Sequence, residues 1–458
     1  MAFVKNLTFI GVGLLGAFVH ELGAAEASFQ LLTTPDGQPS YDFQTPNAVS
    51  ADGSVVVGQM GLQEAFRWTA ADGIVGLGYI ADFDGFQESS ANGISGDGKI
   101  IAGYSSSSNA STEAFRWTAS GGMTSLRDPA SDNFFYEANG VSGDGSAIVG
   151  VEIVAGHNPA IIEAFRWTQG RGSVGLGQLS GGMYGSVALA ASYDGSAIVG
   201  YSDSADSGGY PQAFRWTDKT GIQRLGDLPG GPTGSLGRAV SANGSVVVGE
   251  SWTEGAWYAY RWTQKAGMIQ LGRLYASEHD VDVNIAKAVS ADGTRIVGTA
   301  DFYDDTISDY RSVAFIWDAE HGMRDLNTVL QDEYGLDLRG LVLAEATAIS
   351  ADGSTIVGTT EGNYGWYAWV AHIPTPLDEL IERVQSLSIA DQQNAELLAN
   401  LRNAQQFGVT GQCRKELKEL SFFVRKISLS ANKGVIDQAA AAALTATVNS
   451  VTSQLECD

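Results

Sequence analysis

Hydrophobic and polar positions alternate along most of this chain, in short runs separated by Asp-Gly or Asn-Gly pairs. The run "AVSADGSVVVG" begins at position 48, and close copies begin at 93, 239 and 348. Such alternation is typical of β-strands, because successive side chains of a strand point to opposite faces of the sheet. Two apolar runs split by an Asp-Gly pair predict an antiparallel hairpin with a two-residue type I′ turn.

The Asp-Gly or Asn-Gly pair recurs seven times, at positions 52, 97, 144, 194, 243, 292 and 352. Each copy continues to a second glycine, then to an aromatic strand such as "EAFRWT" at 64, and then to a short fourth segment such as "IVGLG". Four short strands per unit, with units spaced by 45 to 60 residues, predict a mainly β protein built as a seven-bladed β-propeller. A pair of β-sandwiches is the alternative fold.

The seventh unit stops after "YAWVAH" and has no fourth strand before Pro374. Residues 29–32, "FQLL", have the pattern of the missing strand. We therefore expect the N-terminal segment to complete the last blade as its outer strand. This arrangement closes the ring and leaves no open sheet edge there.

The repeat "AVSADGSVVVG…EAFRWT…GLG" resembles the HAF-type extracellular repeat family of secreted and surface proteins of bacteria. The likeness covers roughly residues 29–372. It implies a propeller and an extracellular address for residues 28–373, and it implies no agreed reaction.

The composition changes at Pro374, after which glycine nearly vanishes and apolar residues recur at helical spacing from Leu377 to Leu387. Further stripes over about 389–406, 412–429 and 435–456 predict a small α-helical bundle over residues 374–458. Thr375 and Pro376 read as the cap and first turn of its first helix.

The chain has only two cysteines, Cys413 and Cys457. An antiparallel pair of the last two helices brings them together, so we expect one disulfide. The tail resembles the FIMAH-type helical domain of secreted microbial proteins, in stretches such as "LIERVQSL" and "GVIDQAAAAAL". That resemblance implies attachment or interaction rather than catalysis.

Charge and the N-terminus restrict the partners and the address. The formal charge is −25, from 27 Lys and Arg against 52 Asp and Glu, which argues against nucleic acid or an anionic membrane surface as partner. Residues 1–27 combine an early Lys5, an apolar run from Leu7 to Val19 and an Ala25-x-Ala27 end, the pattern of a cleaved secretory signal. An uncleaved anchor is the alternative. We expect export to the periplasm, the cell surface or the outside.

Candidate binding residues lie in the irregular segments. Alternating strand directions place the second-to-third and blade-to-blade loops on one face of a propeller, where aromatic residues interleaved with acids suit sugar stacking or a protein anchor. The alternative for each residue is that it folds back over a blade end. The candidates are Phe83, Asp84, Phe86, Phe135, Tyr136, Trp252, Trp257, Asp280, Tyr303, Asp304, Asp305, Tyr364 and Trp366.

The repeated residues themselves have structural explanations. The acid of each Asp-Gly pair is a turn former, and the arginines of the "FRW" strands, beginning with Arg67, are expected to stack on aromatic rings or to cap strand carbonyls. The histidines lack metal-ligand spacing, and we predict no cofactor. Calcium is an alternative at Asp301, Asp304, Asp305 and Asp309, although their order does not match an EF-hand loop.

Together these patterns favour an exported, non-catalytic binding or surface-interaction protein with an extracellular glycan or protein as its partner. The alternative is a secreted carbohydrate-active hydrolase or lyase with carboxylates of several blades around the central channel. A purely structural envelope protein is a third possibility.

Overall fold

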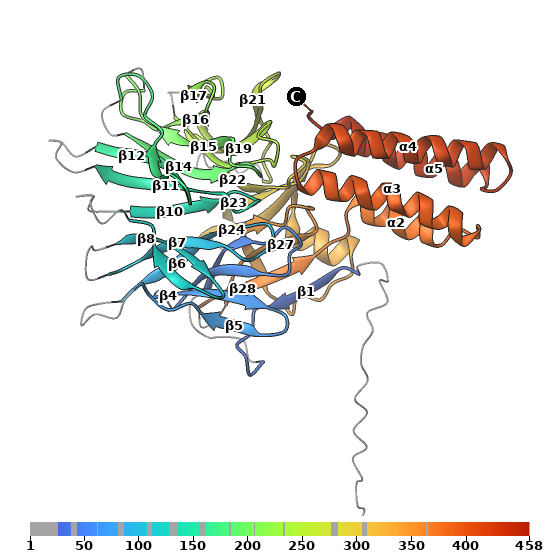
Figure 1. The fold of residues 1–458 in the computed structure, drawn as a ribbon, viewed down its shortest axis with the longest axis horizontal. Coiled ribbons are helices and arrows are strands. Elements are labelled where there is room, and N and C mark those ends of the chain that lie inside the picture. Colours follow the sequence, from blue (N-terminus) through green and yellow to red (C-terminus); the bar gives the residue numbers. More distant parts are fainter. Residues whose placement is uncertain are drawn as a thin grey trace, which may run out of the picture.

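The computed structural model describes residues 26–457, apart from 38–43, 62, 81–86, 108–111, 128–135, 155–160, 183–184, 206, 232–233, 276–282, 305–308 and 363–364. Seven antiparallel four-stranded sheets form a ring, which confirms the seven-bladed propeller, and four helices follow it (Figure 1). The predicted signal segment lies outside the described residues except for positions 26 and 27.

Each blade is one repeat, with the four strands paired in sequence order. Blades one to three are β2 (Gln44–Val49), β3 (Val56–Met60), β4 (Glu64–Thr69), β5 (Gly73–Gly76); β6 (Ser89–Ile94), β7 (Ile101–Ser105), β8 (Glu113–Thr118), β9 (Gly122–Ser125); and β10 (Tyr136–Val141), β11 (Ala147–Val154), β12 (Ile161–Thr168), β13 (Gly172–Gly175). Blades four and five are β14 (Ser186–Ala191), β15 (Ala197–Ser202), β16 (Gln212–Thr217), β17 (Gly221–Arg224); and β18 (Ser235–Val240), β19 (Val246–Thr253), β20 (Ala256–Thr263), β21 (Gly267–Gln270).

The last two blades complete the ring. Blade six is β22 (Val283–Val289), β23 (Ile296–Asp304), β24 (Asp309–Asp318) and β25 (Gly322–Asp325). Blade seven is β26 (Val342–Ile349), β27 (Thr355–Gly362) and β28 (Gly365–His372), and its fourth strand is β1 (Ser28–Leu31), which pairs antiparallel with β28. The expected closure by the N-terminal segment is confirmed.

The aromatic residue of each third strand fills the space between two blades. Its side chain is fully buried in all seven copies: Phe66, Phe115, Phe165, Phe214, Tyr260, Phe315 and Trp369. Phe66, for example, packs against Val357 and Val370 of blade seven. Burying one such ring contributes about 1.5–3 kcal/mol, so the repeat supplies one hydrophobic cluster at each blade interface.

The predicted type I′ turn at the Asp-Gly pairs is wrong. In the first copy the turn is closed by a hydrogen bond from Gly53 N to Ser50 O (3.0 Å), and the positive φ of 72° belongs to the glycine. Asp52 does not share it, because it accepts hydrogen bonds from Ser54 N (3.0 Å) and Ser50 Oγ (2.8 Å), which hold a wider turn. The same serine, acid or amide, and glycine form this turn in every blade.

We call the end of the propeller that carries these seven turns the turn face, and the opposite end, where the second strand of each blade meets the third, the loop face. Two of the repeated arginines cap turns of the next blade: Arg215 Nε donates to Gly244 O (2.8 Å), and Arg261 Nε donates to Gly293 O (3.4 Å). Arg166 lies over the ring of Trp216, 5.8 Å from its centroid. In blade six Ile316 occupies the arginine position, and Arg295 Nη1 caps Gly353 O instead (2.9 Å).

A short helical insertion between blades six and seven was not predicted. It comprises α1 (Leu326–Thr328) and the π-helical turn η1 (Val329–Glu333). Leu326, Val329 and Leu330 are buried in the cluster between these two blades. The insertion accounts for the 60-residue spacing of the last repeat.

The C-terminal helices are α2 (Pro376–Gln385), α3 (Asp391–Val409), α4 (Cys413–Asn432) and α5 (Gln438–Gln454). Thr375 and Asp378 form a capping box at the start of α2, as the Thr-Pro pair predicted. Cys413 and Cys457 form the expected disulfide, with Cα atoms 5.5 Å apart. None of the helices in the described part of the chain has the length and apolar composition that a membrane crossing requires.

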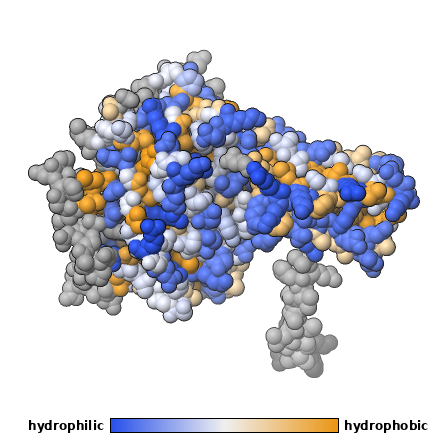
Figure 2. Space-filling model, turned by 45° about the horizontal axis from the view of Figure 1, so that its top comes forward, coloured by the Kyte–Doolittle hydropathy of each residue, from blue (hydrophilic) through white to orange (hydrophobic). Residues whose placement is uncertain are grey.

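This helical module, α2 to α5, rests on the turn face. Asn243 Nδ2 of the blade-five turn donates to Glu456 O (2.9 Å), and Arg295 Nη2 of blade six donates to Pro374 O (2.9 Å). The four helices project away from the propeller side by side (Figure 1). Figure 2 shows mainly hydrophilic residues over the visible face of the module, with small apolar patches between them.

Candidate functional site

Antiparallel pairing places the second-to-third and blade-to-blade connections on the loop face, as predicted. Many candidate residues of these connections lie outside the described residues: Phe83, Asp84, Phe86, Phe135, Asp280, Asp305 and Tyr364. Tyr136 begins β10, and its side chain is not described.

The described aromatic candidates pair with each other across hairpins. Trp252 and Trp257 face each other across β19 and β20, with ring centroids 5.5 Å apart at 75°. Tyr303 pairs with Tyr310 in the same way, at 5.3 Å and 79°. Such edge-to-face pairs stabilise a hairpin end, while Trp366 keeps 37% of its surface exposed.

The structure describes three of the four acids that the sequence offers as calcium ligands, Asp301, Asp304 and Asp309. Asp304 forms an ion pair with Arg311 (3.0 Å), and Asp301 accepts a hydrogen bond from Thr299 Oγ1 (3.4 Å). Asp309 accepts from the backbone N of Tyr310 (2.8 Å). Among the residues that the structure describes, no group of three His, Cys, Asp or Glu side chains could hold a metal ion.

A different set of residues converges near the propeller axis. The innermost strand of every blade has a β-bulge at the same position of the repeat, where the register with the second strand shifts by one residue, and β26 has a second bulge between Leu343 and Glu345. The bulge brings a carbonyl, such as Glu137 O, so close to the second-strand glycine that a side chain at Gly150 would collide with it. We call the seven bulged residues the inner belt: Asn47, Asn92, Asn139, Leu189, Arg238, Lys287 and Thr347.

In blades one to three the inner belt joins neighbouring blades with neutral amides. The side-chain nitrogens of Asn47, Asn92 and Asn139 donate to the carbonyls of Ala91, Ala138 and Ala188 in the next blade, at 2.9 to 3.0 Å. Thr347 does the same between blades seven and one, donating to Pro46 O (2.5 Å). These contacts satisfy backbone acceptors without burying charge.

In blades five and six the belt is charged. Arg238 makes two hydrogen bonds to the carboxylate of Glu250 (2.6 and 2.5 Å), and Lys287 pairs with Glu345 of blade seven. The Arg238 side chain keeps 34% of its surface exposed and Lys287 keeps 25%, whereas Glu250 keeps 4%. The two cations therefore remain accessible to solvent inside the ring.

Ionisable groups of other blades act on the same region. Tyr104 donates to Glu88 (2.9 Å), and burial together with that carboxylate raises the pKa of Tyr104 to about 12. Burial raises the pKa of Glu137, and the charges of Glu137 and Arg238 both act on Tyr201. Groups of blades three, four and five are thus close enough to interact.

Burial and the charge of Arg238 lower the pKa of Lys287 to about 8. Burial also raises the pKa of Glu250, against the opposing effect of Arg238. A site of this kind presents cationic and phenolic donors beside carboxylate acceptors, so it can hydrogen-bond a ligand rich in hydroxyl or carboxylate groups.

The inner belt was not among the predicted site residues. The signal is present in the repeat, three positions before each turn serine: "PNAVS", "ANGIS", "ANGVS", "ALAAS", "GRAVS", "AKAVS" and "ATAIS". The other positions of these five-residue stretches carry small or apolar residues. The belt position is an amide in blades one to three and a cation in blades five and six.

The chain is therefore a seven-bladed propeller whose inner belt is charged in blades five and six. No family model and no curated protein matches the chain. Among solved structures, it is similar to an oligogalacturonate lyase in complex with manganese, with 13% identity over 76% of this chain and 97% of the other, at a TM-score of 0.47.

Two further similar structures are an oligogalacturonate lyase from Vibrio parahaemolyticus and TolB from Acinetobacter baumannii. The lyase is 10% identical over 76% of this chain and 98% of its own, at a TM-score of 0.47. TolB is 15% identical over 61% of each chain, at a TM-score of 0.37. These values carry no residue role over to this chain.

Proposed function

We propose that this protein is an exported, non-catalytic carbohydrate-binding protein whose ligand enters from the loop face and contacts the inner belt. One observation carries the proposal: the belt changes from neutral amides to Arg238 and Lys287 where the repeat does not require it. The amides of blades one to three already satisfy the carbonyls of neighbouring blades.

Removing charged side chains from water costs free energy. The packing of the blades alone therefore does not explain why the belt is charged. Arg238 and Lys287 donate hydrogen bonds, and Tyr201 adds a phenolic hydroxyl. The carboxylates of Glu345 and Glu137 add hydrogen-bond acceptors. A carbohydrate offers hydroxyl groups that both donate and accept, which matches this mixture better than a flat protein surface does.

Export is part of the same proposal. The pattern of residues 1–27 supports it, and a disulfide between Cys413 and Cys457 is typical of proteins in oxidising compartments. The FIMAH-like tail would then attach the propeller to a surface or partner.

A second candidate is a carbohydrate-active hydrolase or lyase. The observation that favours it is the pair of shifted groups: a lysine with a pKa of about 8 and a glutamate, Glu137, with a raised pKa. Lys287 can therefore lose its proton near neutral pH and act as a base, and the raised pKa of Glu137 favours its protonated, acidic form.

The full chain on a glycan array, followed by a turnover assay on each retained glycan, separates these candidates. Binding without turnover is expected, and it should fall at least tenfold in Lys287→Gln. Lys99→Gln is the matched control, because Lys99 is exposed at a turn and pairs with Asp97. Turnover that Lys287→Gln abolishes would replace the binding proposal with the enzyme. Retention of no glycan would reject a carbohydrate ligand.

A further inference from the structure

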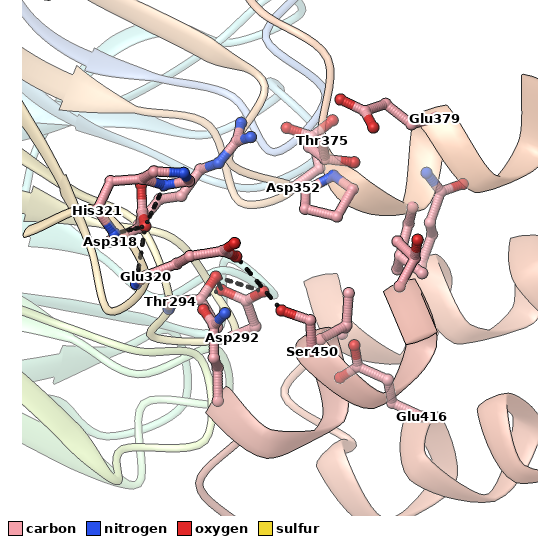
Figure 3. A pocket seen from close by; sticks show the side chains of 18 of the residues that line it. Asp292, Thr294, Asp318, Glu320, His321, Asp352, Thr375, Glu379, Glu416 and Ser450 are labelled. Carbon is pink, nitrogen blue, oxygen red and sulfur yellow. Dashed lines mark hydrogen bonds and ion pairs between the residues drawn. The ribbon is translucent and has the colours of Figure 1, made fainter. Parts of the chain in front are cut away.

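The helical module and the turn face enclose a cavity of about 480 Å³ (Figure 3). Its propeller wall consists of the turns of blades six and seven, with Asp292 and Asp352, and of the β24–β25 turn with Glu320. Its other walls come from all four helices α2 to α5. The volume lies in the range of small-molecule sites.

The cations that line this cavity are already engaged. Arg324 binds Asp318 (2.8 Å) and Glu333 (2.7 Å). Arg295 donates to the backbone oxygens of Gly353 and Pro374, both at 2.9 Å. The carboxylates of the cavity therefore outnumber the cations that can neutralise them.

Glu416 of α4 is the most deeply buried of these carboxylates. The residue is 2% exposed and lines the cavity, and its carboxylate makes no hydrogen bond or ion pair with the residues that the structure describes. Gly408 of α3 makes room for it, because a Cβ there would lie 3.1 Å from both carboxylate oxygens. Burial, with Asp292 as the second cause, raises the pKa of Glu416 to about 8. A buried carboxylate of this kind calls for a hydrogen-bond donor or a positive charge.

The remaining lining combines acids on both sides with an apolar stretch. Figure 3 shows Glu320 and Asp292 on the propeller side, and Glu379 and Glu416 on the helices. Leu377 and Val451 add apolar surface. Acids on opposite walls, together with apolar side chains in the same lining, match a molecule that has a cation at each end and an aliphatic middle.

We propose that this cavity binds a short aliphatic diamine, with one ammonium group at Glu416 and the other at the propeller carboxylates beside Glu320. The methylene chain lies along Leu377 and Val451. Because the ligand contacts both walls, it strengthens the docking of the helical module on the propeller. The cavity lies outside the ring, between the turn face and the helices, whereas the inner belt lies on the innermost strands, so diamine binding and glycan binding can be lost separately.

Calorimetric titration of the full chain with 1,5-diaminopentane tests the proposal. We expect saturable binding that weakens at least tenfold in Glu416→Gln and stays unchanged in Glu382→Gln, an exposed control on α2. 1,5-Pentanediol, which has the same length without the charges, should not bind. No binding of the diamine to the unmodified chain, or equal binding by both variants, would overturn the proposal.

A second variant tests the opposite wall and guards against a folding defect in Glu416→Gln. Glu320 is exposed and accepts one long hydrogen bond, from Ser450 Oγ (3.4 Å), so Glu320→Gln should fold normally. We expect about threefold weaker binding of 1,5-diaminopentane and unchanged binding of 1-aminopentane. Unchanged diamine binding would contradict a ligand that spans both walls.

Discussion

The turn face and the inside of the ring are built from the same seven repeats, yet they differ in how the repeats are used. At the turn face every blade keeps the same serine, acid or amide, and glycine, and new chemistry comes from helices added on top of the turns. Inside the ring the innermost strands themselves change, and Arg238 and Lys287 replace the asparagines of other blades. A repeat can therefore gain a site by addition or by substitution, and substitution leaves a trace at one repeated position.

The largest expected effect is confined to the helical module on the turn face. Replacing both cysteines by serine (Cys413→Ser with Cys457→Ser) should lower the free energy of unfolding of the helical module by up to about 4 kcal/mol, because a 44-residue loop is released in the unfolded chain. All ten tryptophans lie in the propeller, so tryptophan fluorescence reports the blades and ellipticity at 222 nm reports the helices. The ellipticity transition should move to lower temperature while the fluorescence transition stays. Equal shifts of both would contradict separate behaviour of the helical module and the propeller.

The next effect concerns the belt. Arg238→Ala leaves Glu250 buried without its partner and should cost about 3 kcal/mol in urea unfolding followed by fluorescence, at the lower end for a broken buried pair because Arg238 is partly exposed. The double variant Arg238→Asn with Glu250→Gln removes both charges and should recover most of this loss. A double variant as unstable as Arg238→Ala would show that the fold itself requires this ion pair.

Stability at the turn end should depend on pH through Glu416. Its pKa is about 8 in the folded chain against an ordinary value of 4.5, so the folded state holds one more proton between these values. The contribution of Glu416 to the stability of the module is therefore largest below about pH 4.5 and falls by at most about 1.4 kcal/mol per pH unit as the pH rises towards 8. Glu416→Gln should flatten this slope, measured by ellipticity at pH 5, 6, 7 and 8. An unchanged slope would contradict the buried carboxyl.

The smallest effect concerns the uniform turns. Ser142→Ala removes the hydroxyl that accepts from Ala147 N (2.9 Å) and donates to Asp144 (2.7 Å), at a cost of about 1 kcal/mol. Ser192→Ala removes the same bonds from the next blade and should cost the same amount. Neither variant should alter glycan binding, and a selective loss of binding in one of them would remove the distinction between turns and belt.

The sequence predicts the blades well because a repeat is a local pattern. Alternating residues identify the strands, and the incomplete seventh copy identifies "FQLL" as the closing strand. The turn type was wrong because Ser50 and Asp52 bind the backbone with their side chains and hold a wider turn than an Asp-Gly pair alone prefers. The insertion at Leu326–Glu333 was missed, although the 60-residue spacing indicated extra chain there.

The two sites could not be predicted in the same way. The belt depends on a bulge that arises where a strand carbonyl approaches Gly150 and its equivalents, which is a contact between strands rather than a pattern along one strand. The cavity depends on the docking of α4 and α5 against the turns of blades six and seven. Glu416 looks like an ordinary solvated residue of an amphipathic helix until that docking buries it.

Whether the inner belt binds glycans is tested by comparing glycan retention by the full-length chain and by Arg238→Asn with Glu250→Gln, after fluorescence shows that both are folded. We predict that the unmodified chain retains a defined set of glycans and that the double variant loses them while its melting temperature is nearly unchanged. Identical glycan profiles for the two proteins would contradict a binding site at the inner belt.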